Sequence, residues 1–353
     1  PPPPPPPPPP PFQAEAGIRD LDSCLVGSEM CIRDSAKGVE MRPRTEAVSI
    51  DRERQVVQLR NLIDGEESEL AYDELVLATG ATPIVPPLPG IDLPGVTVVA
   101  NLNHAQKIKA AISKGQVGNA VVIGAGAIGI EMAEALTDLW GVETSLVEMQ
   151  PQMLPVAIGA DMSKVMEIHL QEKEVDVRLG TTVTRILGDA ENGVTGVETS
   201  AGELPCDLVI VGKGVTPACG FLPRDLIRID LGIMVDEHLQ TSAACVYAAG
   251  DVAEARDRVR NRPWVNAIWP EAAIQGRVAG LNMAGRRVRY PGSLSRNVMR
   301  VFDLDVMTLG LANAEGIEGL RVIRTGGPSN NGFRSLVLRD DVLVGATLIN
   351  DIE

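Results

Sequence analysis

The stretch AVVIGAGAIGIEMAEALTDLWGVETSLVEM, residues 120–149, decides the fold of this chain. Residues 120–123 form a short apolar run rich in β-branched side chains, which predicts a strand buried on both faces. Three glycines follow as G-x-G-x-x-G, and apolar residues then recur at helical spacing until Gly141. A second apolar run at 144–147 predicts another strand, which Glu148 closes. The sequence therefore predicts a β-α-β unit built around a glycine-rich turn.

Each glycine of this turn has a mechanical reason. Gly124 allows the tight turn, Gly126 lets the backbone approach a pyrophosphate, and Gly129 lets the helix pack closely on the strand. The pyrophosphate would lie on the helix N-terminus, where unpaired N–H groups and the helix dipole favour negative charge. We therefore expect a dinucleotide site here, with Ala127 and Ile128 as its remaining members. The alternative is a tight strand-to-helix turn that binds nothing.

Glu148 indicates which dinucleotide binds. It lies 19 residues after Gly129, where an acid is expected to reach the hydroxyls of the adenosine ribose. A carboxylate accepts hydrogen bonds from a free 2′-hydroxyl and repels a 2′-phosphate, and residues 149–153 contain no arginine to hold that phosphate. NAD is therefore favoured over NADP.

Composition limits the class of protein. With 353 residues the chain is long enough for two or three domains, and 44% apolar with 22% charged residues is typical of a soluble globular protein. A net charge of −15 argues against nucleic acid or an anionic membrane as a partner, and no apolar run is long enough for a membrane span. Five cysteines and three histidines show no metal-ligand spacing and no disulfide framework. We expect a cytoplasmic protein without a metal.

The first 35 residues do not read as part of the fold. Residues 1–11 are all proline, and the segment that follows has no sustained period and no signal-peptide pattern. Its second half resembles translated sequencing-adapter reads. We interpret residues 1–35 as an artefact, or else as a disordered proline-rich tail, and therefore do not read Cys24 and Cys31 as a redox pair.

The rest of the chain predicts an α/β protein. Residues 39–72 read as an antiparallel meander, and a helix from Asp161 is followed by hairpins and a buried strand at 208–211. This pattern predicts doubly wound, Rossmann-like domains with β-meander insertions. From residue 297 we expect a small C-terminal α+β module, with a hairpin that turns at Asp340–Asp341.

Three further stretches carry a resemblance to a known family: YDELVLATGATP (72–83), GKGVTP (212–217) and TSAACVYAAGD (241–251). They resemble the FAD-dependent pyridine nucleotide-disulfide oxidoreductase superfamily, over residues 36–353, and the C-terminal hairpin resembles its rubredoxin-reductase and nitrite-reductase-like branch. The resemblance implies that the Thr79–Gly80 turn and the turn at Gly214 lie near the flavin. It also implies that Asp251, beside Gly250, holds the ribitol of FAD. By itself, Thr79–Gly80 could equally be an ordinary strand-to-loop turn, and Ala218 stands where the family usually has Asn.

The resemblance assigns two further places. Pro270 and Gly285 predict a helix whose N-terminus, in the family, faces the flavin ring; Trp269 would flank that ring or belong to the core. Ala272, Gly276 and Gly280 form a stripe suited to a cofactor or to a tight helix–sheet contact. Glu131 stands where related proteins place a carboxylate near the nicotinamide. The alternative is a first-turn acid that complements the helix dipole.

The expected function is that of a flavin-dependent oxidoreductase, which passes a hydride from NADH to FAD and electrons to an acceptor, either a small protein or a small molecule. The sequence has one G-x-G-x-x-G unit where the family has two, so we expect impaired FAD binding. Cys206, Cys219 and Cys245 read as core residues. The alternatives are a thiol-based NADH oxidase or CoA-disulfide reductase, and a non-catalytic nucleotide-binding subunit or fragment; a homodimer is the oligomer to consider. The expected domains are an incomplete FAD domain (36–112 and 233–296), an NAD domain (113–232) and the C-terminal module (297–353).

Overall fold

The computed structural model describes residues 38–222, 226–314, 316–326 and 332–350. The interpretation of residues 1–35, including Cys24 and Cys31, lies outside this part of the chain. The chain divides into two compact units, one up to Ala71 and one from Tyr72 to Glu353, and each is described by itself.

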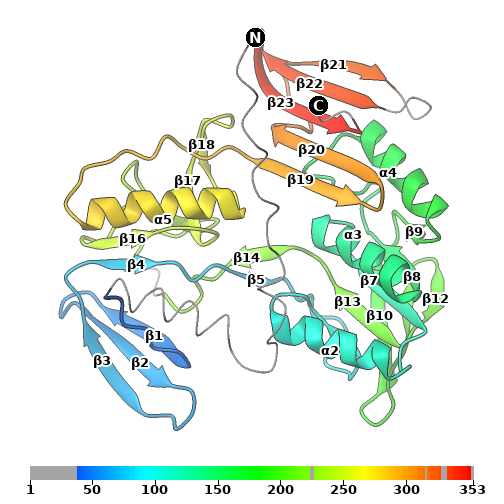
Figure 1. Cartoon of the computed structure of the whole chain (residues 1–353), viewed down its shortest axis with the longest axis horizontal. Coiled ribbons are helices and arrows are strands. Elements are labelled where there is room, and N and C mark those ends of the chain that lie inside the picture. Colours follow the sequence, from blue (N-terminus) through cyan, green and yellow to red (C-terminus); the bar gives the residue numbers. More distant parts are fainter. Residues whose placement is uncertain (1–37, 223–225, 315, 327–331, 351–353) are drawn as a thin grey trace, which may run out of the picture. The chain divides into compact units, whose positions relative to one another are not determined.

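The first unit contains the expected antiparallel meander. Its order is β1-β2-β3, with β1 at Thr45–Asp51, β2 at Val56–Asn61 and β3 at Glu67–Ala71 (Figure 1). Asp51 ends the first strand, and its carboxylate accepts the N–H groups of Glu53 and Arg54, which fixes the turn.

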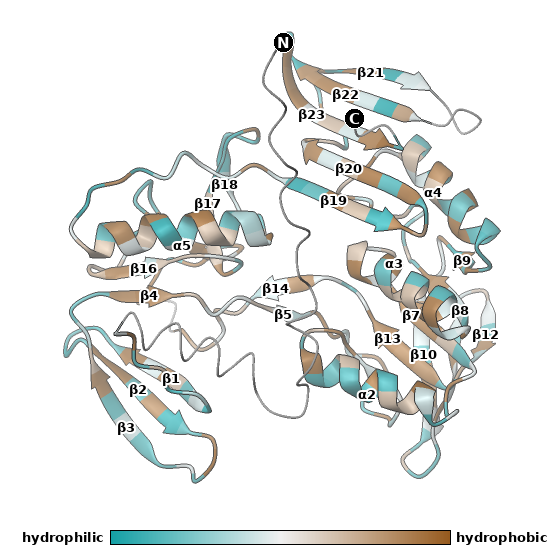
Figure 2. Ribbon diagram, viewed as in Figure 1, coloured by the Kyte–Doolittle hydropathy of each residue, from teal (hydrophilic) through white to brown (hydrophobic). Residues whose placement is uncertain are grey.

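The second unit is organised around a parallel sheet of five strands in the order β6-β13-β7-β8-β9. Alternate residues of its central strands face opposite cores, as expected for a strand buried on both faces. Ala120 and Val122 belong to one apolar cluster, whereas Val121 and Ile123 belong to the other. Figure 2 shows the apolar character along β7 and β13. The strands are β6 (Val96–Thr97), β7 (Asn119–Ile123), β8 (Glu143–Val147), β9 (Asp176–Arg178) and β13 (Leu208–Val211).

Helices cover one face of this sheet and a meander covers the other. Ile108, Ile130 and Met166 bring three helices into the first cluster, and Ile186 and Val197 bring the meander into the second. Gly141 ends the central helix at a φ of 63°, as the sequence predicts. The helical elements are α2 (Leu102–Ser113), α3 (Ala127–Glu134), a π-helical turn (Ala135–Leu139) and α4 (Ala160–Glu172), and the meander consists of β10 (Val183–Asp189), β11 (Gly193–Thr199) and β12 (Gly202–Pro205).

Smaller sheets connect the flavin-side segments. The pairs are β4 (Leu75–Leu77) with β16 (Val246–Ala248), which are parallel, and β5 (Ala81–Pro83) with β14 (Val215–Pro217), which are antiparallel. A further sheet contains β15 (Ile233–Met234), β17 (Ala253–Asp257) and β18 (Arg262–Trp264), and α5 spans Trp269–Met283. Val278 and Ala279 of α5 pack with Tyr247 of β16.

The C-terminal part is a five-stranded antiparallel sheet in the order β19-β20-β23-β22-β21. Asp340 and Asp341 form the expected hairpin turn, with φ of 50° and 60°. Val301, Leu304 and Phe333 join the core of the helical face of the parallel sheet. The strands are β19 (Arg296–Val301), β20 (Leu304–Gly310), β21 (Leu320–Gly326), β22 (Phe333–Arg339) and β23 (Val342–Ile349).

The α/β class with a meander insertion is confirmed, and two details differ from expectation. The parallel sheet starts before residue 113, because β6 pairs with β13 and α2 packs on the sheet. The described elements of the C-terminal module are all strands, so the expected α+β character is not found there. In the described residues, no helix is long and apolar enough to cross a membrane, and no group of three or more His, Cys, Asp or Glu is placed to hold a metal ion.

Candidate functional site

The glycine turn between β7 and α3 leaves no room for side chains at two of its positions. Gly124 has a φ of 107°, and a Cβ there would lie 2.7 Å from the carbonyl oxygen of Gly212. A Cβ on Gly129 would overlap the carbonyl oxygen of Gly124. Gly126 caps α3 with extended backbone, and Ala127 and Ile128 form its first turn, where N–H groups have no partner within the helix. The turn therefore offers backbone donors to an anion, and it fits the pyrophosphate of a dinucleotide.

The end of β13 forms the other wall of this turn, which the sequence reasoning missed. Gly212 follows β13, its N–H donates to the carbonyl oxygen of Ile123 at 2.8 Å, and a Cβ on it would lie 3.2 Å from the Cα of Gly129. The chain moves from β7 to β8 on one side, whereas β13 lies on the other side, so this is the switch point where open α/β sheets bind ligands. The available signal was a glycine directly after the apolar run 208–211, the same pattern that precedes Gly124.

Glu148 lies at the end of β8 and faces the glycine turn. Its Oε2 accepts the N–H of Ala125 and its Oε1 accepts the N–H of Gln150, both at 2.8 Å. Each carboxylate oxygen keeps a further lone pair, since an ionised carboxylate has about four acceptor positions. Two backbone contacts thus fix the side chain while leaving it able to accept from ribose hydroxyls.

Lys213 brings a cation to the same end of the site. Its Nζ lies 3.8 Å from Sδ of Met149, the residue after Glu148. The side chain is exposed, and no described carboxylate forms an ion pair with it. The residues directly after Glu148 include no arginine, but the fold brings Lys213 to this place from the bend after β13. Lys213 is therefore a second residue to consider for cofactor choice.

Glu131 lies on the second turn of α3. The first turn of that helix contains no acidic residue, so the interpretation of Glu131 as a first-turn acid is wrong. The surrounding protein desolvates the carboxyl and Glu134 adds a negative charge, and both raise the pKa of Glu131. A helix dipole that stabilised the carboxylate would lower the pKa instead. The role near the nicotinamide stays a prediction.

The turns expected near the flavin come together in the structure. Gly80 and Gly250 follow the parallel strands β4 and β16, with φ of 69° and 80°. The hydroxyl of Thr79 donates to the carbonyl oxygen of Ala218 at 2.8 Å, and the Ala218 N–H donates to the carbonyl oxygen of Gly80 at 2.9 Å. Gly214, with a φ of 88°, accepts from the N–H of Ile84. The Ala218 backbone thus joins the Thr79–Gly80 turn, and the effect of the missing Asn on a flavin contact stays a prediction.

Asp251 is a half-buried carboxylate without a hydrogen bond or ion pair to any described residue. Burial raises the pKa of Asp251, because the charged form is poorly solvated. It stands directly after the left-handed Gly250, at the carboxyl end of a strand. An acceptor in this position fits a ligand that carries hydroxyl groups, such as the ribitol chain of FAD.

Helix α5 begins beside this turn and shows a different buried face from the one expected. Glu271, Gln275, Val278 and Ala279 are buried, whereas Gly276 and Gly280 are exposed, with no atom within 4 Å of an added Cβ. The interpretation of the small-residue stripe as a tight helix–sheet contact is therefore wrong for the described residues. Trp269 begins the helix and is 83% exposed, so it is not a core residue.

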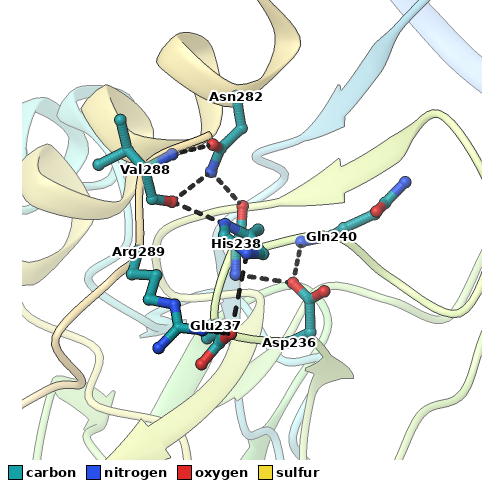
Figure 3. A network of polar contacts seen from close by, with 7 residues as sticks. All are labelled: Asp236, Glu237, His238, Gln240, Asn282, Val288 and Arg289. Atoms are coloured by element: carbon teal, nitrogen blue, oxygen red, sulfur yellow. Dashed lines mark hydrogen bonds and ion pairs between the residues drawn. The ribbon is translucent and has the colours of Figure 1, made fainter. Parts of the chain in front are cut away.

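The far end of α5 is fixed by a polar network (Figure 3). The Asn282 amide donates to the carbonyl oxygens of His238 and Val288 and accepts the Val288 N–H, all within 2.9 Å. Nδ1 of His238 lies 2.9 Å from the same Val288 oxygen. Asp236 holds the loop by accepting the N–H groups of His238 and Gln240. The helix is thereby attached to the loop that precedes β16.

The described cysteines do not suggest thiol chemistry. Cys206 is buried between β12 and β13, and burial, followed by the charge of Asp207, raises the pKa of its thiol to about 12. A cleft of about 450 Å³ beside α2 is lined by His104 and Lys107 among others, but by none of the predicted cofactor residues. It is therefore not part of the candidate site.

Comparisons with known proteins show the family of this chain. The profile of the pyridine nucleotide-disulphide oxidoreductase family matches residues 6–270, a range that begins inside the segment interpreted as extraneous. The chain is 32% identical to an NADH oxidase of Methanocaldococcus jannaschii, covering 78% of this chain and 61% of that protein. It is 34% identical to an NAD(P)H sulfur oxidoreductase (CoA-dependent) of Pyrococcus abyssi, covering 82% and 64%. The chain thus spans about three fifths of the length of these curated relatives.

A solved structure supports the same assignment. An FAD-dependent pyridine nucleotide-disulphide oxidoreductase from Desulfovibrio vulgaris superposes with a TM-score of 0.78 at 32% identity, covering 87% of this chain and 78% of that one. The resemblance inferred from the three sequence stretches is confirmed. The chain belongs to the pyridine nucleotide-disulphide oxidoreductase family.

Proposed function

We propose that this chain is the NADH-binding and part of the flavin-binding portion of an oxidoreductase that passes a hydride from NADH to FAD and electrons to an acceptor. The observation that carries the proposal is the glycine turn between β7 and α3, which Gly212 at the end of β13 closes, with Glu148 fixed at its edge. Bound FAD would supply the redox chemistry, by accepting a hydride and releasing electrons. The residues of this chain bind the two cofactors, orient them and shield them from water.

Each group of residues has a distinct task in this proposal. Gly124, Gly126 and Gly129 admit the pyrophosphate of NADH, and Glu148 accepts from its adenosine ribose. Asp251 accepts from hydroxyl groups of the flavin's ribitol chain. The backbone turns at Gly80 and Gly214 lie near the flavin, and Glu131 stands near the nicotinamide, where its raised pKa reflects a partly desolvated carboxyl.

The acceptor is a small molecule or a small protein. The relatives named above are an NADH oxidase and a CoA-dependent sulfur oxidoreductase, so related proteins act on different acceptors. Because the described cysteines are buried or half-buried members of the fold, we favour direct transfer from the flavin over a thiol relay in this part of the chain.

The test is anaerobic reduction of FAD by NADH, with FAD in excess so that weak retention of the flavin does not limit the result. The chain should accelerate bleaching of the flavin absorbance over that of free FAD and NADH, and a dye acceptor should then restore it. Asp251→Ala should weaken the acceleration, and Tyr247→Phe, outside the proposed site, should preserve it. No acceleration by the unaltered chain at saturating FAD and NADH would refute the proposal.

A further inference from the structure

A chain of buried polar side chains stands behind the Gly250–Asp251 turn. The N–H of Gly250 donates to Oε1 of Gln275 at 2.8 Å, and Nε2 of Gln275 lies 3.3 Å from the Tyr290 hydroxyl. That hydroxyl donates to Oε2 of Glu271 at 2.6 Å. Gln275, Tyr290 and Glu271 are only 2%, 6% and 4% exposed. Burying three polar side chains is costly unless each finds partners, and here each does.

The hydrogen bonds that connect Gly250, Gln275, Tyr290 and Glu271 all donate in the same direction, from Gly250 toward Glu271. An ionised carboxylate is only an acceptor, so the Tyr290 proton is directed to Glu271. Burial and the hydrogen bond to Glu271 raise the pKa of Tyr290, so its hydroxyl keeps that proton. The tyrosine oxygen is then left to accept from the Gln275 amide nitrogen. This requires the amide oxygen of Gln275 to face the N–H of Gly250.

Glu271 has an ionic partner as well. Arg296, the first residue of β19, places its guanidinium 3.5 Å from Oε1 of Glu271. A carboxylate buried to this degree needs such compensation for lost hydration. Two oxygens of one carboxylate therefore face two different partners, the Tyr290 hydroxyl and Arg296, and this fixes its orientation.

We propose that Glu271, acting through Tyr290 and Gln275, is a positioning residue that locks the Gly250–Asp251 turn so that the Asp251 carboxylate faces a hydroxyl-bearing ligand. The identity of the ligand rests on the proposed flavin function. The hydrogen bonds that hold the Gly250–Asp251 turn, which we call the lock, do not depend on any ligand. Gly250 needs such a lock because glycine samples left-handed and right-handed backbone about equally well. Without the Gln275 contact, the turn and the carboxylate that follows it would lose their fixed direction.

The test combines amide hydrogen exchange at Gly250, resolved by NMR, with the affinity for FAD measured by fluorescence titration. Tyr290→Phe removes one hydroxyl and keeps the ring in the apolar cluster that Tyr290 forms with Tyr247 and Val278. Gln275→Met removes the acceptor of the Gly250 N–H and keeps the side-chain length. Tyr247→Phe is the matched control, because Tyr247 belongs to the same cluster and its hydroxyl has no hydrogen bond to any described residue.

Both test variants should speed Gly250 exchange by about fivefold to tenfold, the change expected for one lost hydrogen bond, and should weaken FAD binding several-fold. Glu271→Gln should speed the exchange as well. An amide at position 271 can also donate a hydrogen bond, so it no longer requires the Tyr290 hydroxyl to donate to it. Tyr247→Phe should alter neither quantity, and NADH affinity should stay the same in all variants. Unchanged Gly250 exchange in both Tyr290→Phe and Gln275→Met would overturn the inference. If exchange responds but the unaltered chain binds no FAD at any concentration, the lock stands as a property of the turn, and its proposed ligand and the flavin function are both refuted.

Discussion

Glu148 and Asp251 are both carboxylates that follow a parallel strand, but their surroundings differ. Glu148 accepts two backbone N–H groups, whereas Asp251 has no hydrogen bond or ion pair to any described residue. The Glu148 carboxylate is therefore fixed by the fold without a ligand. The Asp251 carboxylate has no such partner, so its ionised form lowers the stability of the free chain.

Asp251→Asn should therefore stabilise the free chain at neutral pH. The folded pKa of Asp251 lies above the ordinary value of 3.8, so the folded chain holds the proton more tightly than the unfolded chain. As pH rises through the folded pKa, Asp251 ionises and the free energy of unfolding falls. Asparagine does not ionise, so the variant keeps this part of the stability. Thermal melts should show a higher Tm for the variant at pH 7.5 and a smaller difference near pH 4. A lower Tm for the variant at both pH values would contradict this reading.

Lys213 gives a second prediction at the scale of the residue. Its ammonium lies beside Met149, close to the place expected for the adenosine ribose. Lys213→Gln should weaken NADPH binding by about fivefold, the effect of one partly exposed ion pair of about 1 kcal/mol, and leave NADH binding nearly unchanged. Titration calorimetry with both cofactors measures this. Lys107→Gln, on the outer helix α2, is the control and should change neither affinity; an equal loss of NADH and NADPH binding in Lys213→Gln would show that the residue does not discriminate between them.

At the scale of the element, the β-α-β unit is the part that the sequence defines best. Buried parallel strands have apolar runs, and the glycines allow one compact path between them, so local sequence was sufficient. The same holds for the Asp340–Asp341 hairpin, the meander at 39–72 and the helix from Pro270 to Gly285. The contact between Gly212 and the glycine turn joins segments more than 80 residues apart, and no local pattern specifies it.

The buried face of α5 shows why helical spacing alone can mislead. Small residues at 272, 276 and 280 suggested a packing surface, but the structure turns Glu271 and Gln275 inward instead. Those two polar residues are accepted in the core because Tyr290 and Gly250 complete their hydrogen bonds. A sequence read by hydropathy assigns them to the solvent side.

Two glycine substitutions test how closely helix α3 packs on the glycine turn after β7. Gly129→Ala should destabilise the chain by about 2 kcal/mol or more, because the new methyl group overlaps the Gly124 carbonyl in a fully packed turn. Gly276→Ala is its matched control, since its Cβ enters open space on a helix, where alanine is favoured by up to about 1 kcal/mol. Urea unfolding gives both values. If Gly129→Ala is as stable as the unaltered chain, the strand and helix are not in the close contact described.

At the scale of the whole molecule, the two cofactor sites are unequal. The sequence contains one G-x-G-x-x-G turn, and we propose NAD as its ligand because Glu148 lies at its edge. On the flavin side, the proposed contacts are Asp251 and backbone turns, which would contribute a few hydrogen bonds of about 1 kcal/mol each. The 353-residue chain should therefore purify with little yellow colour and take up FAD only when it is in excess. Stoichiometric FAD in the purified chain, measured by its visible absorbance, would contradict this expectation.

Comparison of NADH and NADPH affinity tests the central claim most directly. Glu148 at the edge of the glycine turn should make NADH bind at least about tenfold tighter than NADPH, a difference of about 1.4 kcal/mol. In Glu148→Ala the gap should narrow, because the repulsion of the 2′-phosphate and the acceptors for the ribose hydroxyls are both removed. Isothermal titration of the unaltered chain and this variant at one salt concentration gives the four dissociation constants. Equal or tighter binding of NADPH by the unaltered chain, or no saturable binding of NADH, would contradict the assignment of residues 120–149 as the NADH site.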